Sequence, residues 1–249
     1  MSRHRIALIS DIHGNLLALR RVLHDIHARG VDQIACLGDV ATLGPHPSEV
    51  LALVRQSCDF FILGNHDEYL LDATSMEQHT TSPLVLASVD QCRSLLGEGE
   101  VEFVRSFAER VTLPLGRDRS LLLFHGSPQS NNCDLVSETP AEELDRHLRG
   151  HAEVVMAGGH THIQMLRSHR GRLLVNPGSV GLPFERFVAG ASPTVLAHAA
   201  YAVVQCRADE VSIELYRLEL DRLALAEAAR AWAAPLASYL ALQYATGEP

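Results

Sequence analysis

The chain has 249 residues, of which 47 % are hydrophobic and 20 % are charged, and its formal net charge is -9 with the histidines neutral. This length and composition are typical of a globular protein that buries a large apolar core without disulfide bonds. The negative balance argues against broad nucleic-acid binding, which needs a field of lysine and arginine over the phosphates. It does not exclude a small phosphorylated substrate, because bound cations can reverse the local field.

The five cysteines are an odd number and include no CxxC pair, which is typical of a reduced intracellular protein. The apolar run 6–9 is too short for a signal peptide, and no apolar stretch reaches transmembrane length. We therefore expect a cytoplasmic location and no membrane partner. The sequence leaves the oligomeric state open, including a homo-oligomer.

The first third of the chain alternates short apolar runs with segments of helical periodicity. Strands are predicted at 6–9, 34–37 and 60–63, and helices at 15–28 and 48–56. This βαβαβ order predicts a parallel sheet with right-handed crossovers.

The rest of the chain predicts helices over 68–110 and then a return to strands. The expected strands are 121–124, 154–156, 173–175, 201–204 and 211–216. Their short connections favour an antiparallel arrangement of the last three. Residues 183–198 are expected to form a loop, and 221–243 a terminal helix or helix pair interrupted by Pro235. Since no linker or repeat is visible, we expect one domain over 1–249, with two sheets flanked by helices.

Each of five predicted strands ends in a side chain that can bind a metal ion. These residues are Asp11, Asp39, Asn65, His125 and His160, and His13, His66 and His162 follow one or two positions later. In open α/β sheets, ligands bind at the carboxyl ends of the strands. His160 and His162 alternate in what we expect to be an extended segment, so both side chains should point the same way.

The residue types favour a pair of divalent cations. Carboxylates, imidazoles and an amide without thiolates suit Mn, Fe, Zn or similar ions better than a structural zinc. Seven such ligands exceed the need of one ion, so two ions sharing a carboxylate are expected. Such pairs lie about 3.5–4 Å apart and clamp the oxygens of an in-line displacement.

Each of these residues also has a structural alternative. Asp11 or Asp39 could cap a following helix, Asn65 could be a turn residue, and His125 could bond to backbone. His66 could be a buried structural histidine rather than a catalytic one. Asn15 and Asn176 are candidates for contact with the phosphate or for support behind the ligands, and turn chemistry explains them equally well.

Five ordered motifs resemble the calcineurin-like metallophosphoesterase superfamily. They are Asp11-Ile-His13, Gly38-Asp39, Gly64-Asn65-His66-Asp67, His125-Gly126 and Gly159-His160-Thr-His162. The sequence around them, including Asn176-Pro-Gly-Ser179, resembles the small YfcE-like branch. Together the motifs extend from residue 6 to about 183, which is most of the chain.

This resemblance implies a four-layer α-β-β-α sandwich with two mixed sheets, the metallo-dependent phosphatase fold. It implies a metal-dependent phosphoesterase with two divalent metal ions (Mn, Fe, Zn or Ni). Asp39 would bridge the ions, and a metal-bridging hydroxide would attack a phosphodiester, a phosphomonoester or a dinucleoside polyphosphate. His66 would protonate the leaving oxygen. The remaining ligands would divide between the two ions as Asp11, His13 and His162 for the first, and Asn65, His125 and His160 for the second.

One motif departs from the superfamily's protein phosphatases, which read GDxxDRG where this chain reads Gly38-Asp39-Val-Ala-Thr42-Leu43-Gly44. The second acid and the arginine are missing, which disfavours a protein phosphatase and leaves open what orients His66. The alternative function is a non-catalytic metal-binding protein-interaction module of the same fold. The complete ligand set together with His66 argues against it.

Overall fold

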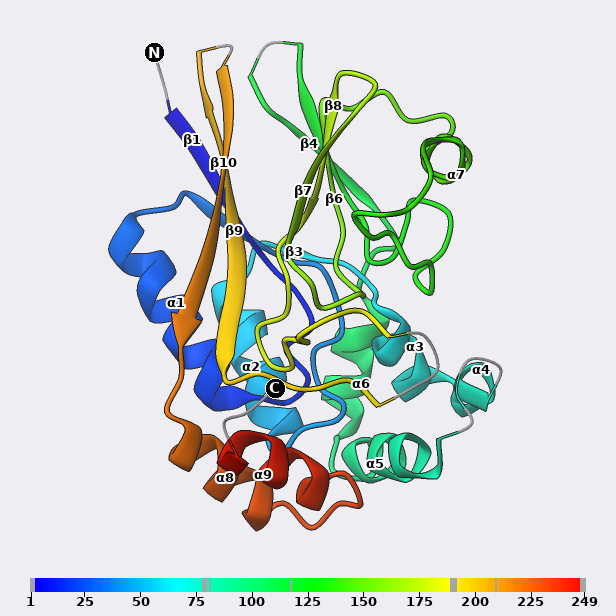
Figure 1. Cartoon of the computed structure of the whole chain (residues 1–249), viewed down its shortest axis with the longest axis vertical. Helices are drawn as coiled ribbons and strands as arrows, with labels where there is room; N and C mark the ends of the chain where they lie inside the picture. Colours follow the sequence, from blue (N-terminus) through cyan, green and yellow to red (C-terminus); the bar gives the residue numbers. More distant parts are fainter. Residues whose placement is uncertain are drawn as a thin grey trace.

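The computed structural model describes residues 3–77, 80, 82–116, 118–188, 192–208 and 210–246, and it contains two five-stranded sheets (Figure 1). The first sheet has the order β10-β9-β1-β2-β3. Its strands are β1 (Arg3–Ile9), β2 (Gln33–Cys36), β3 (Phe60–Phe61), β9 (His198–Arg207) and β10 (Glu210–Glu219). The three strands β1, β2 and β3 are parallel, as predicted, and β9 runs antiparallel to both β1 and β10.

The second sheet has the order β4-β5-β6-β8-β7. Its strands are β4 (Val111–Pro114), β5 (Ser120–Leu123), β6 (Val155–Ala157), β7 (Met165–His169) and β8 (Arg172–Asn176). The central strands β5, β6 and β8 are parallel, and the two edge strands are antiparallel to their neighbours. Both sheets are therefore mixed.

The helix over 141–147 was not predicted, and the other helices of the described chain overlap the predicted helical segments. Together the helices are α1 (Leu16–Arg29), α2 (Pro47–Ser57), α3 (Asn65–Leu71), α4 (Ala73–Glu77), α5 (Pro83–Ser94), α6 (Glu98–Arg105), α7 (Ala141–His147), α8 (Arg222–Ala231) and α9 (Ala237–Thr246). Pro235 lies in the break between α8 and α9, as expected. Within the described ranges, no helix is both long enough and apolar enough to cross a membrane.

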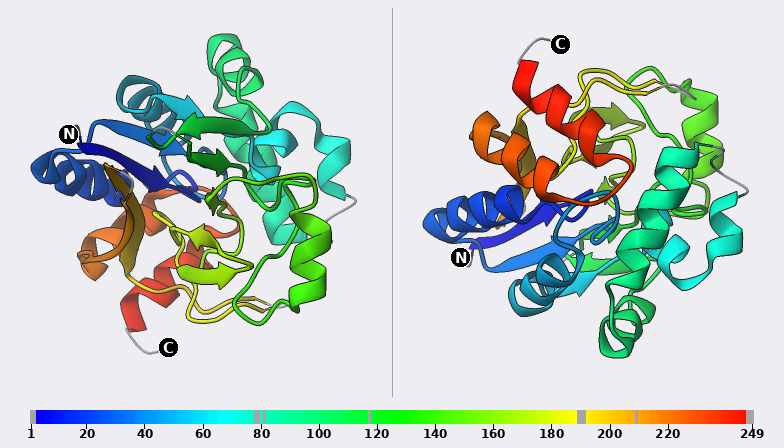
Figure 2. Two further views of the ribbon diagram at one scale, coloured as in Figure 1. Left: turned by 90° about the horizontal axis from the view of Figure 1, so that it is seen from above. Right: turned by 90° about the horizontal axis from the view of Figure 1, so that it is seen from below.

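Alternation along the strands divides the core into the three interfaces of a four-layer sandwich. In β1, Ile6 and Leu8 point between the two sheets, whereas Ala7 and Ile9 pack with helices that include α1, α2, α8 and α9. In the second sheet, Leu122 points instead towards the cluster that contains residues of α7. The predicted four-layer α-β-β-α arrangement is confirmed, and Figure 2 shows the layers from above and below.

The prediction that strands 173–175, 201–204 and 211–216 form one antiparallel set is wrong for the first of them. The residues 173–175 belong to β8, which lies in the second sheet, parallel to β6 and antiparallel to β7. Only β9 and β10 form the expected hairpin. The segment after β8 carries the chain across to the other sheet, so closeness in sequence does not mean pairing here.

Candidate metal centre

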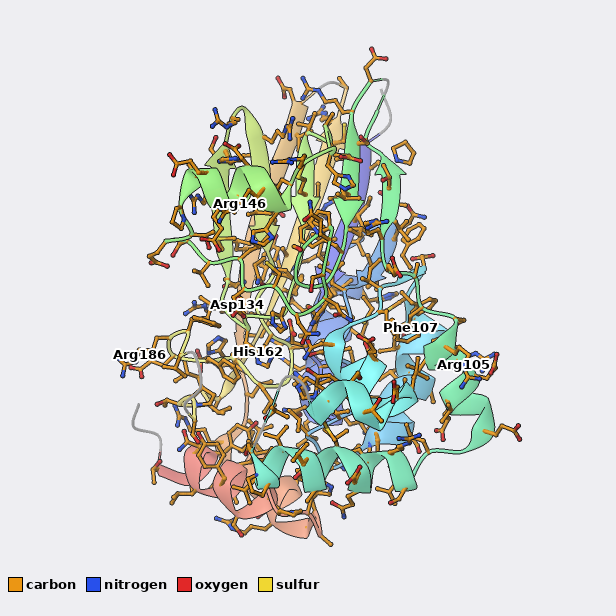
Figure 3. All side chains as sticks on the ribbon, turned by 90° about the vertical axis from the view of Figure 1, so that its right-hand side faces the viewer. Arg105, Phe107, Asp134, Arg146, His162 and Arg186 are labelled. Carbon is orange, nitrogen blue, oxygen red and sulfur yellow. The ribbon has the colours of Figure 1, made fainter. Side chains whose placement is uncertain are left out.

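All seven candidate ligands meet in one cluster, where the carboxyl ends of strands from both sheets approach each other. Six of the seven are buried, and His160 is half-buried. The two sheets are joined there by the backbone N–H of His160, which donates to the Asp11 carboxylate at 3.2 Å. Figure 3 shows His162 between the strand-rich part of the molecule and the helices.

The backbone at the cluster is in an uncommon conformation. Five ligands have positive φ angles, namely Asp11 (53°), His13 (45°), Asp39 (58°), His160 (68°) and His162 (62°). The expectation that 160–162 is extended is therefore wrong, because both histidines occupy the left-handed region. This region is sparsely populated by non-glycine residues, and such residues concentrate at functional sites.

Two glycines permit the close approach of the ligand loops. A Cβ atom on Gly64 would lie 2.1 Å from the Asp39 Oδ1 atom, and a Cβ atom on Gly159 would lie 1.9 Å from the Ser10 Oγ atom. Any side chain at either position would therefore separate the strand ends that carry the ligands.

A first group of acceptor atoms is formed by Asp11, His13, Asp39 and His162, whose ligand atoms all lie within 4.8 Å of one another. The Nδ1–H of His162 donates to the Leu182 carbonyl at 2.5 Å, which leaves the lone pair on Nε2. That Nε2 atom lies 3.1 Å from the Nε2 atom of His13 and 3.5 Å from a carboxylate oxygen of Asp11. The lone pair of His162 Nε2 and the Asp11 carboxylate oxygen therefore face one another, an arrangement that a cation stabilises.

A second group of acceptor atoms lies around Asn65. Its Oδ1 atom is 3.0 Å from the Nε2 atom of His125 and 2.9 Å from the Nδ1 atom of His160. The Nδ1–H of His125 donates to the Leu37 carbonyl at 2.6 Å, so its Nε2 is again free to bind. The Nδ2 group of Asn65 donates to the Tyr69 hydroxyl at 3.2 Å, which turns the amide oxygen towards the histidines.

Asp39 lies between these two groups. Its Oδ2 atom is 3.6 Å from the Nε2 atom of His13, and its Oδ1 atom is 3.4 Å from the Nε2 atom of His125. The same Oδ1 atom accepts the backbone N–H of His66 at 2.9 Å. One carboxylate thus presents an oxygen to each group.

The pKa values of these groups reflect their burial. Burial raises the pKa of both Asp11 and Asp39 to about 7, because water no longer stabilises the charged forms. Burial lowers the pKa of His162 to about 3. The pKa of His13 lies well below its ordinary value, because the ring is buried and because His162 lies beside it. These imidazoles are therefore neutral at neutral pH, as metal ligands must be.

Asp67 holds the ligand loops through the backbone. Its buried carboxylate accepts the N–H groups of Asp39 at 2.7 Å, Val40 at 2.9 Å and Gly64 at 3.0 Å. It therefore ties the end of β2 to the start of α3, and it does not hydrogen-bond to the His66 ring.

His66 is half-buried and lines a cavity beside the cluster. Its ring centroid lies 5.1 Å from that of His13 and 5.0 Å from that of Tyr69, in both cases edge to face. Its Nδ1 atom is buried and has no hydrogen-bond partner among the described residues. Burial and the surrounding imidazoles, His162 first among them, lower the pKa of His66 well below its ordinary value.

The two candidate supporting asparagines both hold loops. The Asn15 side chain caps α1 by accepting from the Ala18 N–H at 3.1 Å and donates to the Gly181 carbonyl at 3.0 Å. Asn176 donates to the Gly159 carbonyl at 2.6 Å, directly behind His160. Both residues therefore lie behind the ligands.

The structure adds residues that the sequence did not single out. The Asp134 carboxylate lies 3.2 Å from the Nε2 atom of His160, and Figure 3 shows Asp134 on the same side of the molecule as His162. Asn132 accepts the Tyr69 hydroxyl proton at 3.0 Å. Both residues follow His125 in a segment without strand or helix periodicity, so no sequence signal identified them.

The fold and this cluster define the class of protein: a two-sheet sandwich whose strand ends could hold a metal ion, as in metallophosphoesterases. Residues 5–200 match the family model described as the calcineurin-like phosphoesterase superfamily domain, and the chain belongs to that superfamily. The predicted family is thereby confirmed.

Similar proteins span almost the whole chain. A metallophosphoesterase of known structure from Sphaerobacter thermophilus is 25 % identical, with a TM-score of 0.74, and the match covers 98 % of this chain and 99 % of that one. The hypothetical protein PH1004 from Pyrococcus horikoshii shares the fold with a TM-score of 0.72 at 17 % identity, covering 88 % of this chain and 90 % of that one. The uncharacterized protein MJ0912 from Methanocaldococcus jannaschii is 26 % identical over 89 % of this chain and 90 % of its own.

Proposed function

We propose that this protein hydrolyses phosphate esters with two divalent cations, bound by the two acceptor groups and shared through Asp39. The observation that carries the proposal is the convergence of imidazole nitrogen atoms with carboxylate and amide oxygen atoms on two adjacent points. Asp39 offers one oxygen to each point. A structural core would instead place donors opposite these acceptors.

The first cation would be held by Asp11, His13 and His162, and the second by Asn65, His125 and His160. Such a pair supplies Lewis acidity and positive charge, which favour attack of water on a phosphate and neutralise its oxygens. Backbone carbonyls hold two of the imidazoles in the orientation that binding requires, because they accept the Nδ1–H groups of His125 and His162.

His66 is the proposed proton donor to the leaving oxygen. It lines the cavity beside both groups and, in the proposed division of roles, holds no cation. Its lowered pKa makes the ring neutral in the free protein. An approaching phosphate anion favours the protonated ring, so substrate binding would supply the charged form that donates the proton.

The proposed substrate is a small phosphorylated molecule, and the broad candidates are phosphodiesters, phosphomonoesters and dinucleoside polyphosphates. Mn, Fe, Zn and Ni are the candidate ions, because the ligands are carboxylate, imidazole and amide groups. The proposed location is the cytoplasm.

The test is metal analysis combined with ester hydrolysis. Purified protein saturated with Mn should contain close to two ions per chain and hydrolyse bis(para-nitrophenyl) phosphate. A chelator should abolish this activity, and added Mn should restore it. At most one ion per chain at saturation would refute the two-ion site. Two bound ions without turnover of any phosphate ester would support the non-catalytic module instead.

A further inference from the structure

A cavity of about 400 Å³ opens directly beside the candidate metal centre. One side is formed by ligands and by His66, Asn132 and Asp134. Its volume falls within the range of sites that enclose small molecules. Most of the other lining residues are apolar.

These apolar residues form a wall, which comes from two separate parts of the chain. Its main residues are Leu182, Phe184 and Val188 from the loop before β9, and Leu236, Tyr239 and Leu240 from around α9. Tyr69, Thr80 and Val85 also line the cavity, and residues 189–191 lie outside the described ranges.

The wall begins at the ligands themselves. The Phe184 ring stacks on His162 with a centroid distance of 4.1 Å and an interplanar angle of 18°. The Tyr239 hydroxyl donates to the Pro193 carbonyl, and the Val195 N–H donates to the Gln243 side chain at 3.0 Å. These bonds attach α9 to the loop, so the wall is part of the fold.

None of the described residues that line this cavity is a lysine or an arginine. Arg186, two positions after Phe184, is exposed, and Figure 3 shows it at the outer edge of the molecule. Asp134, at 48 % side-chain exposure, adds negative charge at the opening. Apart from the His66 ring, only cations at the centre would therefore balance a substrate's charge.

We propose that the preferred substrate is a singly charged phosphodiester that places a bulky apolar substituent against the wall of Leu182, Phe184, Val188, Leu236, Tyr239 and Leu240. This inference rests on the proposed function and narrows it. A monoester dianion or a polyphosphate chain would carry extra charge into a cavity without a lysine or arginine to pair with it. An apolar substituent would cover the wall and remove it from water.

The test compares inhibitors of equal charge and increasing apolar size. Dimethyl, dibutyl and diphenyl phosphate are each singly charged, and phenyl phosphate provides the doubly charged comparison. With the Mn-loaded protein and bis(para-nitrophenyl) phosphate as substrate, the inhibition constant of diphenyl or dibutyl phosphate should be at least about tenfold lower than that of dimethyl phosphate. If diphenyl phosphate has the lower inhibition constant, the wall prefers an aryl substituent, and if dibutyl phosphate has the lower constant, it prefers an alkyl substituent. Phenyl phosphate should inhibit more weakly than diphenyl phosphate.

Variants connect this preference to the wall. Tyr239→Ala should raise the diphenyl phosphate constant about tenfold and leave the dimethyl phosphate constant within about twofold. Leu242→Ala is the matched control, because Leu242 is a residue of α9 that is 59 % exposed and lies outside the cavity, so this variant should behave as wild type. If Tyr239→Ala does not fold, Val188→Ser takes its place in the test, because Val188 is a half-exposed residue of the wall. Val188→Ser should raise the inhibition constant of diphenyl phosphate several-fold.

The outcomes separate this inference from the function beneath it. Equal inhibition by dimethyl and diphenyl phosphate, or tighter inhibition by phenyl phosphate, would overturn the apolar-diester proposal while hydrolysis still supported the phosphoesterase. Failure to hydrolyse any ester at saturating Mn would overturn the proposed function. Titration calorimetry would then still test whether the wall binds an apolar substituent. Binding of diphenyl phosphate should give a more negative heat-capacity change than binding of dimethyl phosphate, because it buries more apolar surface. Tyr239→Ala should reduce this difference.

Discussion

Replacing Asp67 with asparagine should destabilise the protein even before any metal binds. The buried carboxylate accepts three backbone N–H groups, from Asp39, Val40 and Gly64. An asparagine offers only one oxygen, and its amide group would face at least one of these N–H groups as a second donor. Asp67→Asn therefore leaves at least one buried donor without an acceptor.

The magnitude follows from those three bonds. A buried donor left unpaired costs about 1–3 kcal/mol, and each bond that remains loses the extra strength of a charged acceptor. We expect a loss of about 2–4 kcal/mol in the free energy of unfolding. For a chain of this length each kcal/mol corresponds to about 2–4 °C in the melting temperature.

The assay is urea unfolding of the chelator-treated protein, so that metal binding does not add to the stability. Asp90→Asn is the matched control, because Asp90 is an exposed residue of α5. Its free energy of unfolding should stay within about 0.5 kcal/mol of wild type. If Asp67→Asn costs less than about 1 kcal/mol, the three bonds do not hold the ligand loops as described.

Three further predictions concern the centre itself. Asp39→Asn should lose metal affinity and activity together, because the amide offers one neutral oxygen in place of two charged ones. Two tightly bound ions in that variant, by elemental analysis, would show that Asp39 does not bridge. Metal affinity should fall by at least about tenfold per pH unit below 7. Burial raises the pKa of Asp11 and Asp39 to about 7, so the ions must displace protons from both carboxylates. His162 has a pKa of about 3 and therefore carries no second proton in this range. Titration calorimetry between about pH 5 and 7 checks this, and a pH-independent affinity contradicts it. His66→Asn should keep both ions while turnover drops about 10²–10⁴-fold, most for poor leaving groups; loss of an ion instead would make His66 a ligand.

The position of the site was predictable because parallel strands deliver their carboxyl ends to one edge. Asp11, Asp39 and Asn65 each follow an apolar run, and that local pattern was enough to place them together. The same pattern could not show that two sheets share the site. The prediction that β8 pairs with β9 failed because pairing depends on the long connection through 177–197, which carries no periodic signal.

The support around the ligands was less predictable. Asp67 acts on backbone groups 27 and 28 residues earlier in the chain, and only the folded register brings them together. The apolar face of α9 looks the same in sequence whether it covers a core or a cavity. The left-handed backbone of His160 and His162 was missed because nothing in a Gly-Gly-His-Thr-His run distinguishes it from an extended segment.

The left-handed backbone at five candidate ligands has a consequence for how this protein could change over generations. An L-residue in that conformation costs about 1–2 kcal/mol, and glycine avoids this cost. Selection for heat resistance alone would therefore favour glycine at a half-buried position such as His160, and would remove that ligand while leaving the sandwich intact. A heat-stable lineage that still carries these side chains must be under selection for what they bind.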